Sequence, residues 1–179
     1  VLMLDLTKNQ ATKGLQKIYQ ILDKNYKKGF ITKQELVDIK SRIGISHDYE
    51  MLKNKEIIIE AIYEDLDIKT KALKAAEEHM NPNGFLASNT STIPISILAS
   101  KLIDPQKFIG LHFFSPVHKM KLVEVIKGQK TSSEALGRAL SFASLIKKTP
   151  IVVNDSPGFY TTRVFVKYPF EGMAMLSEG

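Results

Sequence analysis

The sequence contains no cysteine, which excludes disulfide bonds, a thiolate nucleophile and a metal site built on sulfur. This absence fits a reducing compartment. No apolar run approaches the roughly 20 residues that a membrane-spanning helix needs. No basic leader precedes the first apolar residues, and the chain begins inside an apolar run without an initiator Met. We therefore expect a protein that is not secreted and has no membrane span, and we expect the chain to be a fragment of a longer one.

The charge of the chain is basic, with a formal net charge of +6 over 179 residues. Lysines cluster in "KNYKKGFITK", with few aromatic residues among them. Nucleic-acid-binding proteins usually interleave aromatic residues or arginines with the basic residues, so we expect no nucleic-acid partner. Two interpretations of the lysines remain open: a solvated surface, or attraction for a small polyanionic ligand.

Apolar runs of strand length alternate with amphipathic helical patterns along the chain. This order predicts an α/β fold with a mostly parallel sheet covered on both faces. Near the amino terminus, Gly29 is placed to end one helix and "TKQE" (32–35) is a capping box that begins another, so residues 10–43 are predicted to form a helical hairpin. Strands are expected near residues 1–5, 56–64, 85–91, 107–114, 121–128 and 149–155, and helices near 64–80, 94–102 and 132–147. The chain breaks at Pro157-Gly158 before a last helical segment.

The runs "GLHFF" and "KLVEVI" are consecutive strands whose connection is too short for a parallel crossover, so they should pair antiparallel. If that connection is centred on His118, His112 lies opposite Glu124 on the same face of the sheet. A carboxylate in that place orients the imidazole and stabilises its charged form, which makes the histidine more basic. The alternative is that each side chain reaches solvent separately at a sheet edge.

Polar side chains follow several of the predicted strands. The stretch "SNTS" (88–91) comes after one strand, Asp5 after another, and Glu64 with Asp65 after a third. In an open parallel sheet the ligand crevice lies outside the carboxyl ends of the strands. The alternative for "SNTST" is ordinary turn chemistry, with a Ser or Thr capping the helix after Pro94. No pair of histidines has a strong metal-ligand spacing, so no metal site is predicted.

Four motifs occur in the order and at the spacing found in the L-3-hydroxyacyl-CoA dehydrogenases, a family that the chain resembles over essentially its whole length. They are "IIIEAIYEDLDIK", "FLASNTSTIPI", "FIGLHFFSPVHKMKLVEVI" and "DSPGFYTTR". The "HFFSPV" and "PGFYTTR" forms look most like the dehydrogenase part of the alpha subunits of multifunctional fatty-acid-oxidation complexes. The resemblance implies NAD-dependent oxidation of a (S)-3-hydroxyacyl-CoA to the 3-ketoacyl-CoA in fatty-acid β-oxidation, in the bacterial cytoplasm or the mitochondrial matrix.

The resemblance also implies roles for individual residues. His112 matches the catalytic base, Glu124 its orienting carboxylate, and Ser91 a serine near the substrate oxygen and nicotinamide. Thr162 stands where the monofunctional enzymes usually carry a catalytic asparagine. The positions that match cofactor-binding residues are Asp5, Ala61, Glu64, Lys69, Asn89, Ser91 and Ser115. The helical hairpin resembles an arm that covers coenzyme A, with Lys24, Lys27 and Lys28 among the candidates for its phosphates.

One departure concerns the phosphate-binding turn. The pattern G-x-G-x-x-G, which the family carries between a first strand and a helix, does not occur in this sequence. The expected fold is therefore a Rossmann-type doubly wound sheet lacking its first strand and Gly-rich turn. Residues 1–155 would form a partial NAD-binding domain, and residues 156–179 the start of a helical domain. The family implies a homodimer or a multienzyme complex; a catalytically silent acyl-CoA-binding module, or a dehydrogenase for another hydroxy acid, remains an alternative.

Overall fold

The computed structural model describes residues 1–179, which form two compact units, residues 1–53 and residues 54–179. The first unit contains strands β1 (Leu2–Leu4) and β2 (Gly44–Ser46), which pair in parallel, and helices α1 (Lys8–Lys27) and α2 (Lys33–Ser41) between them. A 3-10 helix, η1 (Tyr49–Leu52), ends the unit. The predicted hairpin is present, whereas β2 was not predicted because three residues are too few for a periodic pattern.

The turn of this hairpin follows from two local signals. Gly29 adopts φ +72°, a left-handed conformation in which a residue with a Cβ is strained. Its N–H bonds to the carbonyl of Tyr26, and the N–H of Phe30 bonds to that of Asn25, which together form the Schellman ending of α1. Thr32 and Glu35 then form the reciprocal capping box that begins α2.

The second unit is built on a five-stranded sheet in the order β3-β4-β5-β6-β7. The strands are β3 (Ile57–Glu60), β4 (Phe85–Ser88), β5 (Phe108–Phe113), β6 (Leu122–Lys127) and β7 (Thr149–Asn154). Strands β3, β4 and β5 are parallel, β6 is antiparallel to β5, and β7 is parallel to β6. The predicted α/β architecture and its antiparallel step are confirmed. The pair β1–β2 belongs to a separate two-stranded sheet.

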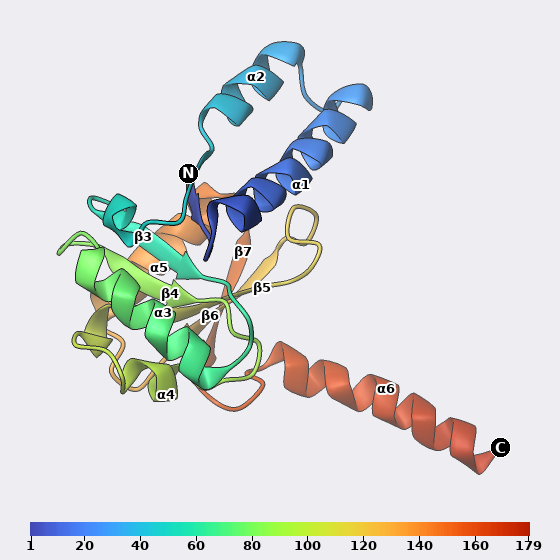
Figure 1. Cartoon of the computed structure of the whole chain (residues 1–179). Helices are drawn as coiled ribbons and strands as arrows, with labels where there is room; N and C mark the ends of the chain where they lie inside the picture. Colours follow the sequence, from blue (N-terminus) through green and yellow to red (C-terminus); the bar gives the residue numbers. More distant parts are fainter. The chain divides into compact units, whose positions relative to one another are not determined.

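Helices cover both faces of this sheet, as Figure 1 shows: α3 (Leu66–His79) and α4 (Ile95–Ala99) lie on one face and α5 (Ser133–Leu145) on the other. On the α5 side, Ala139 packs against a core of strand residues that includes Phe85, Ile109 and Val125. On the α4 side, a Cβ added to Gly110 would lie 2.8 Å from atoms of both Ile95 and Ile126. Glycine at this position therefore lets α4 approach the sheet closely.

Two connecting segments complete the unit. The 3-10 helix η2 (Pro105–Lys107) precedes β5, and α6 (Thr161–Glu178) follows the turn after β7 and extends away from the sheet (Figure 1).

The amino-terminal cap of α4 is not the Ser or Thr side chain of the preceding loop that the sequence suggested as an alternative. The Asp155 carboxylate accepts the N–H groups of Ile95 and Ser96, each at 2.7 Å. The cap comes from the residue after β7, 60 positions along the chain.

Candidate active site

The antiparallel hairpin β5–β6 sets His112 directly opposite Glu124. The imidazole Nδ1 lies 2.7 Å from Glu124 Oε2, His112 is 6% exposed and Glu124 is fully buried. Both lie on the face of the sheet that carries Gly110 and Ile126, because side chains alternate along a strand. The predicted register is confirmed. With Nδ1–H donated to the carboxylate, Nε2 is the ring nitrogen that can accept a proton.

The second carboxylate oxygen of Glu124 is held by backbone donors from the start of α6. The N–H of Thr161 donates to Oε1 at 2.7 Å and the N–H of Tyr160 at 3.2 Å. Desolvation by burial raises the pKa of Glu124, but hydrogen bonding from Thr161 and His112 outweighs it, so the pKa lies below its ordinary value. Glu124 therefore stays ionised beside the imidazole.

Two phenylalanines lie against the His112 ring. The Phe114 ring centroid is 4.7 Å from that of the imidazole, and the Phe159 centroid is 6.0 Å away. Phe159 is 2% exposed. The pair is therefore bordered by apolar surface, which limits its contact with water.

A second polar cluster lies at the carboxyl ends of β3 and β4. Lys69 of α3 is 1% exposed, and its Nζ lies 2.8 Å from Glu60 Oε1 and 3.2 Å from Glu64 Oε2. Lys69 also donates to the carbonyl of Ile62. The other oxygen of Glu60 accepts the Ser88 hydroxyl at 2.5 Å. A buried ammonium needs such partners, so this cluster ties α3 to both strand ends.

Glu64 fixes the loop that carries Ser91. Its Oε1 accepts the Thr90 hydroxyl and the N–H groups of Ser91, at 3.0 Å, and of Thr92, at 3.1 Å. Burial raises the pKa of Glu64, but the hydrogen bond from Thr90 and the Lys69 ammonium outweigh it and lower the pKa to about 2. The loop is therefore anchored on a carboxylate that is ionised at neutral pH.

Asn89 connects this loop to the strand that carries His112. Its Oδ1 accepts the N–H of Phe113, the residue after His112, at 2.8 Å. Ser91 follows Asn89 by two residues in the same loop, and its side chain is exposed to solvent. Asn89 thus ties the loop after β4 to the carboxyl end of β5.

The remaining candidate residues lie outside these two clusters. Ala61 and Ser115 are exposed, and Thr162, the second residue of α6, is half-buried; none of them bonds to the His112–Glu124 pair. Asp5, in the first unit, is exposed directly after β1 and its Oδ1 accepts the N–H of Leu6 at 2.7 Å. Its position at a strand end is as predicted.

Sequence reasoning missed Glu60, Thr90 and Phe159. Glu60 ends the apolar run "IIIE", and a charged residue at the end of a buried strand requires a partner. That signal was available, but the partner could not be chosen from the sequence. Thr90 was predicted to lie at a strand end or in a turn, but its bond to Glu64 was not predicted. Phe159 had no signal, because one aromatic residue after a glycine is common.

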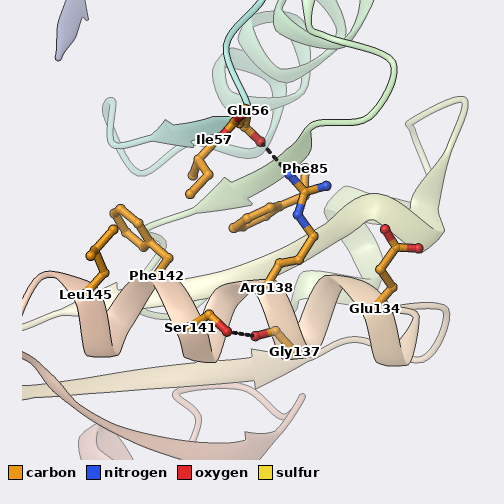
Figure 2. A pocket seen from close by; sticks show the side chains of 9 residues that line it. All are labelled: Glu56, Ile57, Phe85, Glu134, Gly137, Arg138, Ser141, Phe142 and Leu145. Atoms are coloured by element: carbon orange, nitrogen blue, oxygen red, sulfur yellow. Dashed lines mark hydrogen bonds between the residues drawn. The ribbon is translucent and has the colours of Figure 1, made fainter.

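A surface groove lies between the β3–β4 edge and α5, and Figure 2 shows Ile57, Phe85, Phe142 and Leu145 on its walls. The Arg138 guanidinium lies over the Phe85 ring, 5.4 Å from its centroid. None of the candidate site residues lines this groove. No group of His, Cys, Asp or Glu side chains in residues 1–179 is arranged to hold a metal ion, and no helix combines the length and apolar character needed to cross a membrane.

A mostly parallel sheet with polar side chains at its strand ends is typical of nucleotide-binding α/β enzymes, and the buried His–Glu pair supplies a general base. The sequence model of the 3-hydroxyacyl-CoA dehydrogenase NAD-binding domain matches residues 1–156. The chain belongs to this family, whose members are NAD-dependent oxidoreductases, so the predicted family and cofactor are confirmed.

Solved structures of the family agree with the fold. The (S)-3-hydroxybutyryl-CoA dehydrogenase PaaH1 of Ralstonia eutropha is 36% identical with a TM-score of 0.97, and the match covers 100% of this chain and 63% of that one. The 3-hydroxybutyryl-CoA dehydrogenase of Escherichia coli K12 is 30% identical with a TM-score of 0.95, covering 99% and 38%.

The dehydrogenase part of multifunctional enzyme 1 of C. elegans is 26% identical with a TM-score of 0.75, covering 87% of this chain and 35% of that one. The chain thus spans less than two thirds of each of these relatives.

Proposed function

We propose that the chain is the NAD-binding part of an enzyme that oxidises (S)-3-hydroxyacyl-CoA to 3-ketoacyl-CoA in fatty-acid β-oxidation. The observation that carries this proposal is the buried His112–Glu124 pair, with 2.7 Å between Nδ1 and Oε2. Glu124 holds the Nδ1–H tautomer and stabilises the imidazolium. His112 Nε2 then accepts the proton of the 3-hydroxyl group, while the C3–H bond breaks with loss of hydride and the C3–O bond becomes a carbonyl.

NAD supplies the hydride acceptor when it is bound. The polar groups at the strand ends fit such a cofactor, because exposed carboxylates and hydroxyls match the ribose hydroxyls and the nicotinamide amide. We assign Asp5 to the adenosine ribose, Glu64, Asn89 and Ser91 to the nicotinamide end, and Ala61 and Ser115 to flanking contacts. Lys69 is enclosed by protein oxygens, so we propose that it acts by holding Glu64.

The sequence offers no G-x-G-x-x-G turn to hold the pyrophosphate. We propose that the 179-residue chain by itself binds NAD weakly and turns over little substrate. Isothermal titration of the chain with NADH tests this statement. Binding in the low-micromolar range would contradict it.

The acyl-CoA substrate is assigned from the basic hairpin. Lys24, Lys27 and Lys28 are exposed at the end of α1, where ammonium groups can meet phosphates. We propose a domain boundary between residues 155 and 156, with Thr162 at the substrate side of the helical segment that follows. Coenzyme A thioesters and NAD are intracellular metabolites, so we place the protein in the bacterial cytoplasm or the mitochondrial matrix, as a homodimer or within a multienzyme complex.

The deciding experiment replaces one histidine at a time in the full-length protein that carries this chain. His112→Ala should lower kcat by at least about 100-fold, the scale of general base catalysis, while the dissociation constant for NADH stays within twofold. His118→Ala is the matched control, because His118 is exposed in the β5–β6 connection, and it should keep its activity.

Unchanged turnover in His112→Ala would favour the silent acyl-CoA-binding module instead. The remaining hypothesis is a dehydrogenase that acts on another hydroxy acid. A panel of hydroxy acids and their coenzyme A thioesters distinguishes it from the proposed function. Oxidation of a free hydroxy acid faster than of any 3-hydroxyacyl-CoA would overturn the proposed substrate class.

A further inference from the structure

We propose that the turn Pro157–Thr161, which joins β7 to α6, is a positioning device for the His112–Glu124 pair, with Phe159 as its positioning residue. The backbone N–H groups of Tyr160 and Thr161 hold the Glu124 carboxylate, and the Phe159 ring lies beside the His112 ring, with 6.0 Å between the centroids. The effect of this device on turnover rests on the proposed function, whereas its hold on the His112–Glu124 hydrogen bond does not.

Two residues of the turn, Gly158 and Phe159, have positive φ values that direct the following N–H groups toward Glu124. Gly158 has φ +72° and Phe159 has φ +50°, so two successive residues adopt the left-handed conformation. Phenylalanine rarely adopts this conformation, because its Cβ makes the left-handed region unfavourable. The N–H of Phe159 closes the turn on the carbonyl of Ser156 at 2.8 Å. The chain reverses here, so the next two N–H groups meet Glu124.

The burial of Phe159 offsets that cost and fixes the turn. The side chain is 2% exposed, and the burial of so large an apolar group stabilises the folded chain. Phe159 is therefore the residue of the turn whose aromatic side chain lies in the buried interior next to His112. Removing the ring would release the turn and let Tyr160 and Thr161 move away from Glu124.

The anchoring matters because Glu124 is fully buried. Besides His112, its partners lie at the first turn of α6, where the helix dipole favours a negative charge: the two backbone N–H groups and the Thr161 side chain. Without them the carboxylate would keep only one strong partner. It would then be free to rotate or to take up a proton, and either change would weaken its hold on the Nδ1–H of His112.

The first test is spectroscopic and uses the 179-residue chain itself. A hydrogen bond of 2.7 Å to a buried carboxylate gives the Nδ1 proton of His112 a strongly downfield NMR signal that exchanges slowly with water. In Phe159→Ala this signal should move upfield or disappear, and in Phe159→Leu, which keeps apolar bulk, it should shift less. Phe108→Leu is the control, because Phe108 is also fully buried but belongs to the start of β5.

The second test removes a donor and leaves the side chains intact. Tyr160 is replaced by its α-hydroxy acid, so that an ester oxygen stands where the N–H was. The same exchange at Tyr168 of α6 is the control, since both tyrosine side chains are exposed. The downfield NMR signal of the His112 Nδ1 proton should shift or disappear when the ester is at position 160. It should remain unchanged when the ester is at position 168.

In the full-length protein, Phe159→Leu should lower kcat by about 10- to 100-fold, the usual cost of misplacing a catalytic group. The KM for NAD⁺ should stay within twofold, and Phe108→Leu should keep its kcat. If the His112 signal is unchanged in both Phe159 variants and in the Tyr160 ester, the positioning device is refuted. If the signal responds but His112→Ala keeps its turnover, the device stands and the proposed function fails.

Discussion

At the scale of single residues, the two charged clusters differ in what their buried charges do. Glu124 is held by backbone N–H groups and one histidine, whereas Glu60 and Lys69 form a direct ion pair at 2.8 Å. A carboxylate held by N–H groups keeps its charge for a partner that changes protonation. An ion pair enclosed by strand ends serves to fix geometry.

Breaking the Glu60–Lys69 pair should be costly. Lys69→Met leaves the Glu60 carboxylate buried without its cation, so the free energy of unfolding should fall by about 3 to 5 kcal/mol. The double variant Glu60→Gln/Lys69→Met should recover a large part of that loss, because no buried charge is then left unpaired and only the partly exposed Glu64 loses its cation. Urea denaturation followed by circular dichroism measures the unfolding free energy of the original chain, of Lys69→Met and of the double variant.

The matched control is Lys40→Met, which removes a partly exposed lysine 2.6 Å from Asp23. It should cost no more than about 1 kcal/mol, as surface ion pairs do. A Lys69→Met protein as stable as this control would show that the buried pair does not hold the strand ends together.

Glu64 makes folding stability depend on pH. Its pKa is about 2 in the folded chain and 4.5 for the ordinary carboxyl group. A lowered pKa stabilises the folded state above pH 4.5, and that contribution disappears as the pH falls from 4.5 towards 2. Glu64 is partly exposed, so screening reduces the effect to the order of 1 kcal/mol.

The measurement compares the original chain with Glu64→Gln in urea at several values between pH 7 and pH 2. The difference in unfolding free energy should be largest at neutral pH and shrink below pH 4.5. A constant difference across this range would exclude Glu64 as the titrating group. The comparison also cancels the contribution of the other carboxylates.

At the scale of helices and strands, the short helix α4 depends on a distant cap. The Asp155 carboxylate accepts two of its first N–H groups, at 2.7 Å each. Asp155→Ala should lower the free energy of unfolding by about 2 kcal/mol, because two donors lose their partner. Ser132→Ala, which removes the local cap of α5, should cost about 1 kcal/mol.

Urea denaturation of these two variants decides which cap matters more. The expectation is that Asp155→Ala is the less stable protein, since it also disconnects the end of β7 from α4. A smaller loss for Asp155→Ala than for Ser132→Ala would mean that solvent satisfies the freed N–H groups.

The elements show which part of the structure the sequence could predict. The capping box at Thr32 and the hairpin register at His112 and Glu124 depend on residues close in the chain, and both were predicted. The Asp155 cap and the burial of Lys69 depend on residues brought together only by the fold. Local periodicity carries no information about such contacts, so they could not be predicted.

At the scale of the whole molecule, the two compact units differ in their interiors. Among residues 1–53, only Ala11 and Leu52 are buried hydrophobic residues, whereas β4, β5 and β6 of the second unit each contain several. Small units bury little apolar surface and open at low free energy. The amides of α1 should therefore exchange with deuterium much sooner than those of the β4–β6 strands.

Hydrogen exchange followed by mass spectrometry tests this order, with α5 as the reference helix. Both α1 and α5 are regular helices capped at their first turn, by Thr7 and by Ser132. A difference in their exchange must then come from the unit that each one belongs to, because their local hydrogen bonds are alike. We expect α5 to be protected at least about 10-fold more than α1, since opening its unit exposes the sheet core. Equal protection would mean that the units open together, and the hairpin would then be as rigid as the sheet that carries His112 and Glu124.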